Sequence, residues 1–132
     1  MGTPCLIDTN AVIEFLGGML PPDASQWLED HVRTQSGYLS VINQIELLGY
    51  FVPQQEMEQL EAFVAACPIL ALTDQIARRT IALKRQYRIK LPDAVIAASA
   101  IEHEMVLITR NLKDFDFVEG LHVMDSHRLK GN

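Results

Sequence analysis

Short apolar segments alternate along this chain with longer segments whose apolar residues recur at helical spacing, and this alternation most limits how the chain can fold. Strand-like segments joined by single or paired helices predict a parallel sheet covered on both faces, because parallel neighbours need crossover connections. We therefore predict an α/β fold, a three-layer α/β/α sandwich with a central, mostly parallel sheet of about five short strands. The expected strands are residues 5–8, 37–39, 68–72, 106–109 and 121–124, and the expected helices are residues 11–16, 23–34, 41–51, 56–66, 73–87 and one opened by Pro92-Asp93.

Capping signals mark the starts of several expected helices. Asp23 can cap the second helix, and Ser40 can cap the third. Along the third helix we expect Ile42, Ile45 and either Leu48 or Gly49 to lie on one side, which would be the buried one. The last helix is so rich in Ala, Val and Ile that we expect it to be buried on most of its sides.

Length and composition set further limits. The chain has 132 residues, of which 48% are apolar, and we expect one globular domain spanning residues 1–132. The net charge of −6 argues against a protein that coats nucleic acid non-specifically, because such binding depends on Lys and Arg neutralising phosphates. We expect Cys5 and Cys67 to be buried thiols in a reducing compartment. Without a secretory signal or an apolar run of roughly 20 residues, the chain is expected to be cytoplasmic, with no membrane partner.

Polar residues gather at the ends of the expected strands, which is where open parallel sheets bind ligands. Asp8 and Thr9 follow the first strand, Ser40 follows the second and Thr109 ends the fourth. Asp93 begins the helix that leads into the fourth strand. These side chains are therefore expected at one edge of the sheet.

Three acids at this edge would fit a divalent metal site. Glu46 lies inside its helix, and Asn43, three residues earlier, shares its helical face. Hard cations such as Mg²⁺ prefer carboxylate and water oxygens, and they support in-line phosphoryl displacement. Burying Asp8, Glu46 and Asp93 together is costly unless cations compensate the like charges. Taken singly, each acid has a simpler interpretation. Asp8 and Asp93 could each be a helix cap, and Glu46 could be a solvated helix residue.

Four segments of the chain match one known family when they are taken together. They are Leu6-Ile7-Asp8-Thr9-Asn10, then Ser40 followed six positions later by Glu46-Leu47, then Leu91-Pro92-Asp93-Ala94 with Ile96-Ala97-Ala98, and finally Thr109-Arg110-Asn111 followed by Asp114-Phe115. In this order and at these intervals, they make the chain resemble PIN-domain ribonucleases, and among these the compact VapC-type toxins of toxin–antitoxin pairs.

The resemblance implies a metal-dependent endoribonuclease. In this interpretation Asp8, Glu46 and Asp93 bind Mg²⁺ or Mn²⁺, and a water molecule activated at the metal attacks a phosphodiester of RNA. The resemblance also implies a homodimer and a small antitoxin partner whose C-terminal segment covers a groove. The resemblance also implies that four residues support the site by hydrogen bonds, namely Thr9, Asn10, Ser40 and Thr109. We expect the same role for Asn43, because it lies on the same helical face as Glu46.

The fourth acid of the family site is missing from its usual position. Many relatives carry an acid two residues after the threonine at the end of the fourth strand, where this chain has Asn111. Asn111 brings no charge, so a second metal would be held less firmly. Asp114, three positions later, either compensates for this loss or caps a local turn.

A basic stripe lies between positions 78 and 90, where six of the eleven Lys and Arg residues occur with no acid among them. The stripe either guides an RNA backbone towards Asp93 or forms a solvated helix face whose charges pair with acids elsewhere. Apolar side chains near Trp27 and between positions 57 and 64 indicate a partner surface. The candidates for RNA binding are Arg78, Arg79, Lys84, Arg85, Arg88, Lys90 and Arg110.

Other functions stay open at this point. A phospho-receiver domain would need an acidic neighbour for Asp8 and a lysine at the end of the last strand, and the sequence supplies neither. A non-catalytic PIN-like binding module with a degenerate metal site is the alternative that Asn111 favours. The choice of RNA over DNA rests on the resemblance alone, because no residue identified here detects a 2′-hydroxyl.

Overall fold

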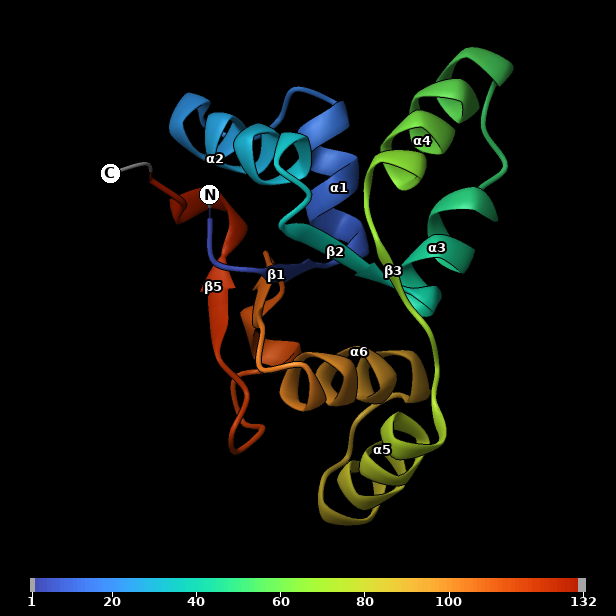
Figure 1. The fold of residues 1–132 in the computed structure, drawn as a ribbon, viewed down its shortest axis with the longest axis vertical. Coiled ribbons are helices and arrows are strands. Elements are labelled where there is room, and N and C mark those ends of the chain that lie inside the picture. Colours follow the sequence, from blue (N-terminus) through green and yellow to red (C-terminus); the bar gives the residue numbers. More distant parts are fainter. Residues whose placement is uncertain (1, 131–132) are drawn as a thin grey trace.

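One parallel sheet organises the structure (Figure 1). The computed structural model describes residues 2–130, and within them a five-stranded sheet has the strand order β3-β2-β1-β4-β5. Every neighbouring pair of strands is parallel. The strands are β1 (Cys5–Ile7), β2 (Gly37–Ser40), β3 (Ile69–Leu70), β4 (Val106–Thr109) and β5 (Val123–Asp125). The predicted α/β class with a mostly parallel central sheet is therefore confirmed.

Helices cover both faces of this sheet. They are α1 (Thr9–Leu16), α2 (Pro22–Arg33), α3 (Val41–Leu48), α4 (Gln54–Ala66), α5 (Asp74–Gln86) and α6 (Leu91–Glu102), together with the 3₁₀ turns η1 (Leu112–Asp114) and η2 (Ser126–Arg128). In Figure 1, α1, α2 and α4 lie on one side of the sheet, and α5 and α6 lie on the other. The helix α3 contacts both α4 and α6, so it joins the two helical layers.

Side chains of the central strand β1 alternate between two cores, as expected of a strand covered on both faces. Cys5 and Ile7 belong to the core beneath α1, α2 and α4, whereas Leu6 belongs to the core against α5 and α6. Cys5 and Cys67 are buried free thiols, and burial raises the pKa of each to about 12. Neither thiol is therefore primed to react as a thiolate.

Most helix starts follow the predicted signals. Asp8 caps α1 by accepting a hydrogen bond from Thr9 N, and Ser40 caps α3 in a reciprocal capping box with Asn43. The helix α6 is buried continuously from Ala94 to Ala100. Asp23 does not cap α2 as predicted, because the helix begins one residue earlier, at a proline, which places Asp23 inside the first turn.

The prediction for α3 was wrong in its length and in its buried side. The helix ends at Leu48, with Gly49 as its C-cap, instead of reaching residue 51. Its buried residues are Asn43 and Leu47, whereas Ile45 is 62% exposed and Leu48 is 37% exposed. The burial of Asn43 follows from hydrogen bonds that satisfy its amide, which lowers the cost of placing a polar group in the core.

In the part of the chain that the structure describes, none of the helices combines the length and the apolarity needed to span a bilayer.

Candidate active site

An acidic cleft opens where the topology of the sheet reverses. The chain leaves β1 towards β2 and β3 on one side and returns to β4 on the other, so β1 and β4 border a switch point of the type at which open parallel sheets bind ligands. Asp8 follows β1 and Thr109 ends β4 at this point. The cleft has a volume of about 520 Å³, and the residues lining it are Asp8, Thr9, Asn10, Ile45, Glu46, Gly49, Tyr50, Asp93, Asn111, Asp114 and Phe115.

Asp8 is held rigidly between β1 and β4. One of its carboxylate oxygens accepts a hydrogen bond from Thr9 N at 2.9 Å, and the other accepts one from the Thr109 hydroxyl at 2.8 Å. The Thr109 hydroxyl in turn accepts a hydrogen bond from Asn111 N at 3.0 Å. Burial raises the pKa of Asp8, and the charges of Glu46 and Asp114 act in the same direction, although the two hydrogen bonds partly oppose this rise.

A second hydrogen-bond chain orients Glu46. The Thr9 hydroxyl donates to Glu46 Oε1 at 2.6 Å and accepts from Asn43 Nδ2 at 3.0 Å. Asn43 Oδ1 accepts a hydrogen bond from Ser40 N at 2.8 Å, which fixes the direction of its amide. Because Asn43 can only donate through its nitrogen, the hydroxyl proton of Thr9 must point towards Glu46. Asn43 and Glu46 thus share one face of α3, as predicted from their spacing.

Asp93 lies half-buried in the first turn of α6. Its pKa is raised to about 6, mainly by burial and then by the negative charges of Asp114, Asp8 and Glu46. The positive charge of Lys90 acts in the opposite direction. Asp93 is therefore close enough to the other three acids for their negative charges to disfavour its ionised form.

Asp114 faces the same cleft from the segment after β4. Asp114 is the last residue of the 3₁₀ turn η1, whose N-cap is Asn111. Asn111 also lines the cleft, one turn earlier. Asn10 completes this side of the cleft as an exposed residue of α1.

The donor set of the cleft fits a hard divalent cation. Four carboxylates line it, and within residues 2–130 no Lys, Arg or His lines the cleft to balance them. Among these described residues, no three His, Cys, Asp or Glu side chains come close enough together to enclose an ion. The structure therefore brings Asp8, Glu46, Asp93 and Asp114 to one cleft but not to one point, as expected of like charges that repel each other.

Several of the predicted RNA-binding residues are engaged within the chain itself. Arg78 pairs with Asp74, and Arg79 donates to Glu102 at 2.6 Å. The side chain of Lys84 donates to the carbonyl oxygen of Ile89 at 2.7 Å. A further ion pair, between Arg110 and Asp125, spans 3.3 Å. Among the described residues, Arg85, Arg88 and Lys90 form no ion pair, so the stripe divides into a paired part and an unpaired part.

Tyr50 is a cleft residue that the sequence analysis missed. We predicted it inside a helix, but α3 ends at Leu48 and Tyr50 then lies at the cleft mouth. Gly49, a frequent helix-ending residue, followed closely by Pro53, was the signal that could have revealed it.

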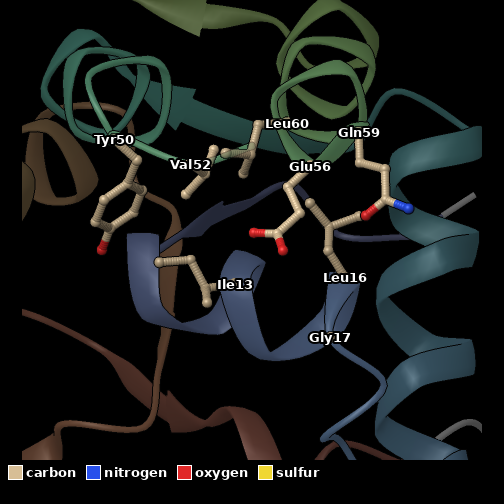
Figure 2. Close-up of a pocket in the computed structure, with 8 residues that line it drawn as sticks. All are labelled: Ile13, Leu16, Gly17, Tyr50, Val52, Glu56, Gln59 and Leu60. Atoms are coloured by element: carbon tan, nitrogen blue, oxygen red, sulfur yellow. The ribbon is translucent and has the colours of Figure 1, made fainter. Parts of the chain in front are cut away.

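An apolar groove lies beside the acidic cleft and shares Tyr50 with it (Figure 2). Figure 2 shows Ile13 and Leu16 of α1 facing Val52 and Leu60, with the Glu56 carboxylate among them. The groove has a volume of about 550 Å³. Trp27, which we expected at a partner surface, does not line this groove and instead stacks on His31 with ring centroids 3.6 Å apart.

Comparison with known proteins identifies the family. A model of the PIN domain matches residues 5–120, and the chain therefore belongs to the PIN-domain family. A chain in a toxin–antitoxin complex from Klebsiella pneumoniae is 33% identical, with a TM-score of 0.76, over 92% of this chain and 97% of the other. The expected resemblance to PIN-domain proteins is confirmed, the structures that share the fold include VapBC toxin–antitoxin complexes, and PIN domains are generally nucleases.

More distant structures share the fold. VapBC2 from Rickettsia felis, bound to a DNA fragment from its promoter, contains a chain with a TM-score of 0.79 at 19% identity, over 92% of this chain and 98% of that one. DNA-bound VapBC from Salmonella typhimurium contains one with a TM-score of 0.77 at 20% identity, over 95% of this chain and 99% of that one. The search of curated proteins returned no match.

Proposed function

We propose that this protein is a divalent-metal-dependent endoribonuclease and the toxin of a toxin–antitoxin pair. The observation that carries the proposal is the meeting of four carboxylates, from four separate segments, in one cleft at the switch point of the sheet. Such a concentration of negative charge is unfavourable for folding unless cations compensate it. Membership of the PIN-domain family supports a nuclease.

Asp8, Glu46 and Asp93 would hold Mg²⁺ or Mn²⁺, directly or through water. When bound, a divalent cation supplies positive charge for the phosphodiester transition state and acidifies water so that it can act as a nucleophile. A bound cation would also lower the raised pKa of Asp93, which favours the ionised carboxylate.

The residues around these acids would keep the site preorganised. Thr109 and Thr9 fix both oxygens of Asp8, and Thr9 also fixes one oxygen of Glu46. Asn43 and Ser40 hold Thr9 from the buried side, so the carboxylates need little rearrangement when the charge of the substrate arrives.

We further propose that Asp114 takes the part of the fourth acid in place of Asn111. Both residues line the cleft, but only Asp114 contributes a negative charge, and that charge raises the pKa values of Asp8 and Asp93. A second cation would then be bound through fewer and more exposed ligands, and hence less tightly, than the first.

The proposed partners are an antitoxin and a second copy of the chain. The structural neighbours come from toxin–antitoxin complexes, which supports an antitoxin. The apolar groove is the proposed seat of its C-terminal segment, and a segment bound there would cover Tyr50 at the cleft mouth. A cytoplasmic location belongs to the same proposal, since free Cys5 and Cys67 are typical of a reducing compartment.

A non-catalytic PIN-like module is the competing function, and Asn111 is the observation in its favour. In that case the cleft would still bind metal weakly, but the protein would cut no RNA. A preference for DNA is the other competing outcome, because no described contact of the cleft distinguishes ribose from deoxyribose.

The test is cleavage by protein freed of any co-purified partner. We expect discrete cuts in structured RNAs with Mg²⁺ or Mn²⁺, none with chelator, and a loss of at least about 10³-fold in Asp93→Asn. Asp23→Asn is the matched control, because Asp23 is also an acid in the first turn of a helix but is exposed and far from the cleft lining. Absence of cutting across diverse RNAs by metal-loaded wild-type protein would favour the binding module, and cutting of DNA alone would revise the substrate.

A further inference from the structure

The connection between α5 and α6 presents two unpaired cations on one side. Tyr87 and Lys90 both have extended backbone conformations, and in an extended segment successive side chains point in opposite directions. Ile89 is buried and Tyr87 is half-buried, whereas Arg88 and Lys90 are exposed. Arg88 and Lys90 therefore project together, away from the core.

This connection is held firmly at three points. Lys84 donates from its ammonium group to the carbonyl oxygen of Ile89 at 2.7 Å. The Tyr87 hydroxyl accepts a hydrogen bond from Glu119 N at 3.0 Å, and the Tyr87 ring packs edge-to-face on Phe117 with centroids 5.3 Å apart. The burial of the Ile89 side chain is the third point, so the two cations project from a fixed backbone.

The connection also borders the acidic cleft. Lys90 is the N-cap of α6 and precedes the cleft residue Asp93 by three positions. Through Tyr87, the connection packs against the segment that follows Asp114, another cleft residue. The charge of Lys90 reaches Asp93, because it lowers the pKa of that carboxyl against the effect of the neighbouring acids.

The other basic residues of the stripe are less available. The ion pairs of Arg78 and Arg79 and the hydrogen bond of Lys84 engage three of the six. Arg85 is exposed in the last turn of α5, within the helix rather than on the connection to Asp93. The two cations nearest to Asp93 in the chain, Arg88 and Lys90, thus form no ion pair among residues 2–130.

We propose that Arg88 and Lys90 form a backbone-binding site that holds the RNA strand beside the phosphodiester to be cut. This inference rests on the proposed ribonuclease function and names the residues that bring a polyanion to a protein of net charge −6. The α-carbons of the two residues are about 7 Å apart in an extended chain, so their side chains can contact successive phosphates of one strand. Contacts of this kind position a strand without reading its bases.

The binding test separates this site from catalysis. In an Asp93→Asn background, which removes a cleft acid and blocks cutting, binding of a fluorescent single-stranded RNA is measured across a salt series. Each phosphate contact contributes about 0.7 to the slope of log K against log salt, so Arg88→Gln with Lys90→Gln should lower the slope magnitude by about 1.4. Arg78→Gln is the matched control, because Arg78 is equally basic but is paired with Asp74, and its slope should not change.

The kinetic test uses protein with Asp93 intact. The double Gln variant should show a KM for RNA at least about 10-fold higher, with kcat nearly unchanged, because the lost contacts are made equally in the ground state and the transition state. A variant with the two cations exchanged, Arg88→Lys with Lys90→Arg, keeps both positive charges. It should therefore bind RNA like the wild type and not like the double Gln variant. Thermal unfolding of each variant checks that these exposed substitutions leave the fold intact.

Three outcomes would overturn the inference. An unchanged salt slope and KM in the double Gln variant would show that the RNA lies elsewhere. Failure of the charge-exchanged variant to restore binding would show that the two positions do not act through their positive charges. A double variant that binds RNA normally but loses a protein partner would assign the connection to that partner instead. These results differ from failure of the proposed function, in which wild-type protein would cut no RNA with any metal.

Discussion

At the scale of single residues, the structural and functional interpretations of the acids are not exclusive. Asp8 caps α1, as an Asp at a helix start usually does, and the same carboxylate lines the cleft. Asp93 lies in the first turn of α6, where the helix dipole favours an acid, yet its neighbours raise its pKa. Sequence could therefore identify these residues as candidates, but only their convergence in three dimensions supports a shared role.

The raised pKa of Asp93 predicts that this residue destabilises the metal-free protein. The pKa of Asp93 in the folded protein is about 6, above the ordinary Asp value of 3.8. The protonated carboxyl therefore contributes its full stabilisation of the fold below pH 3.8, and this stabilisation is lost as the pH rises through 6. At neutral pH we expect metal-free Asp93→Asn to be more stable than wild type by about 1–2 kcal/mol, a figure reduced because the side chain is only half-buried. Urea unfolding at several pH values measures this, and the difference should vanish as the pH falls below 3.8.

The matched comparison is Asp23→Asn, which alters a first-turn acid outside the cleft and should bring no stabilisation. A variant Asp93→Asn that is less stable than wild type at neutral pH would show that Asp93 is satisfied without a cation.

Thr9 is predicted to control the metal affinity of the cleft without touching a metal. Thr9→Val keeps the shape of the side chain but removes the hydroxyl that donates to Glu46, whereas Thr9→Ser keeps the hydroxyl. We expect Mn²⁺ affinity to fall by about 10–100-fold in Thr9→Val and to change little in Thr9→Ser. Equal affinities in the two variants, measured by calorimetry, would contradict the role assigned to this hydrogen bond.

At the scale of elements, periodicity was a reliable guide where a helix packs on apolar neighbours. The helix α4 was predicted nearly at its true bounds, because apolar residues at helical spacing form its buried side, and α5 was predicted within one residue at each end. For α6 only the opening at Pro92-Asp93 was predicted, and the helix begins at Leu91. The helix α3 was mispredicted because its buried side includes a polar residue, Asn43, which bonds to Thr9 from a distant segment. A pattern of apolar residues contains no information about such a contact.

This arrangement predicts that α3 depends on Asn43 for stability. Asn43→Ala removes half of the capping box, leaves Ser40 N without its acceptor and removes the hydrogen bond that the Thr9 hydroxyl accepts. We expect a loss of about 1–3 kcal/mol in the free energy of unfolding. Gln44→Ala, on the next residue of the same helix, should cost less than about 0.5 kcal/mol, and urea unfolding of both variants decides between these expectations.

At the scale of the whole molecule, topology places the site. The parallel sheet and the rule that ligands bind at its carboxyl edge predicted that Asp8, Glu46 and Asp93 lie at one edge, and all three line the cleft at the β1–β4 switch point. The division of the basic stripe could not be predicted, because Glu102, the partner of Arg79, is far along the sequence. The apolar groove likewise depends on how α1 packs beside α4.

The central claim, that carboxylates from four segments form one divalent-cation site, is tested most directly by calorimetric titration with Mn²⁺. Partner-free protein stripped with chelator is titrated at neutral pH beside Glu46→Gln, Asp93→Asn and the control Asp23→Asn. We predict saturable binding by wild type and control, with affinity at least about 10-fold lower in the two cleft variants. No saturable binding by the wild type, or binding that persists unchanged in both cleft variants, would contradict the account.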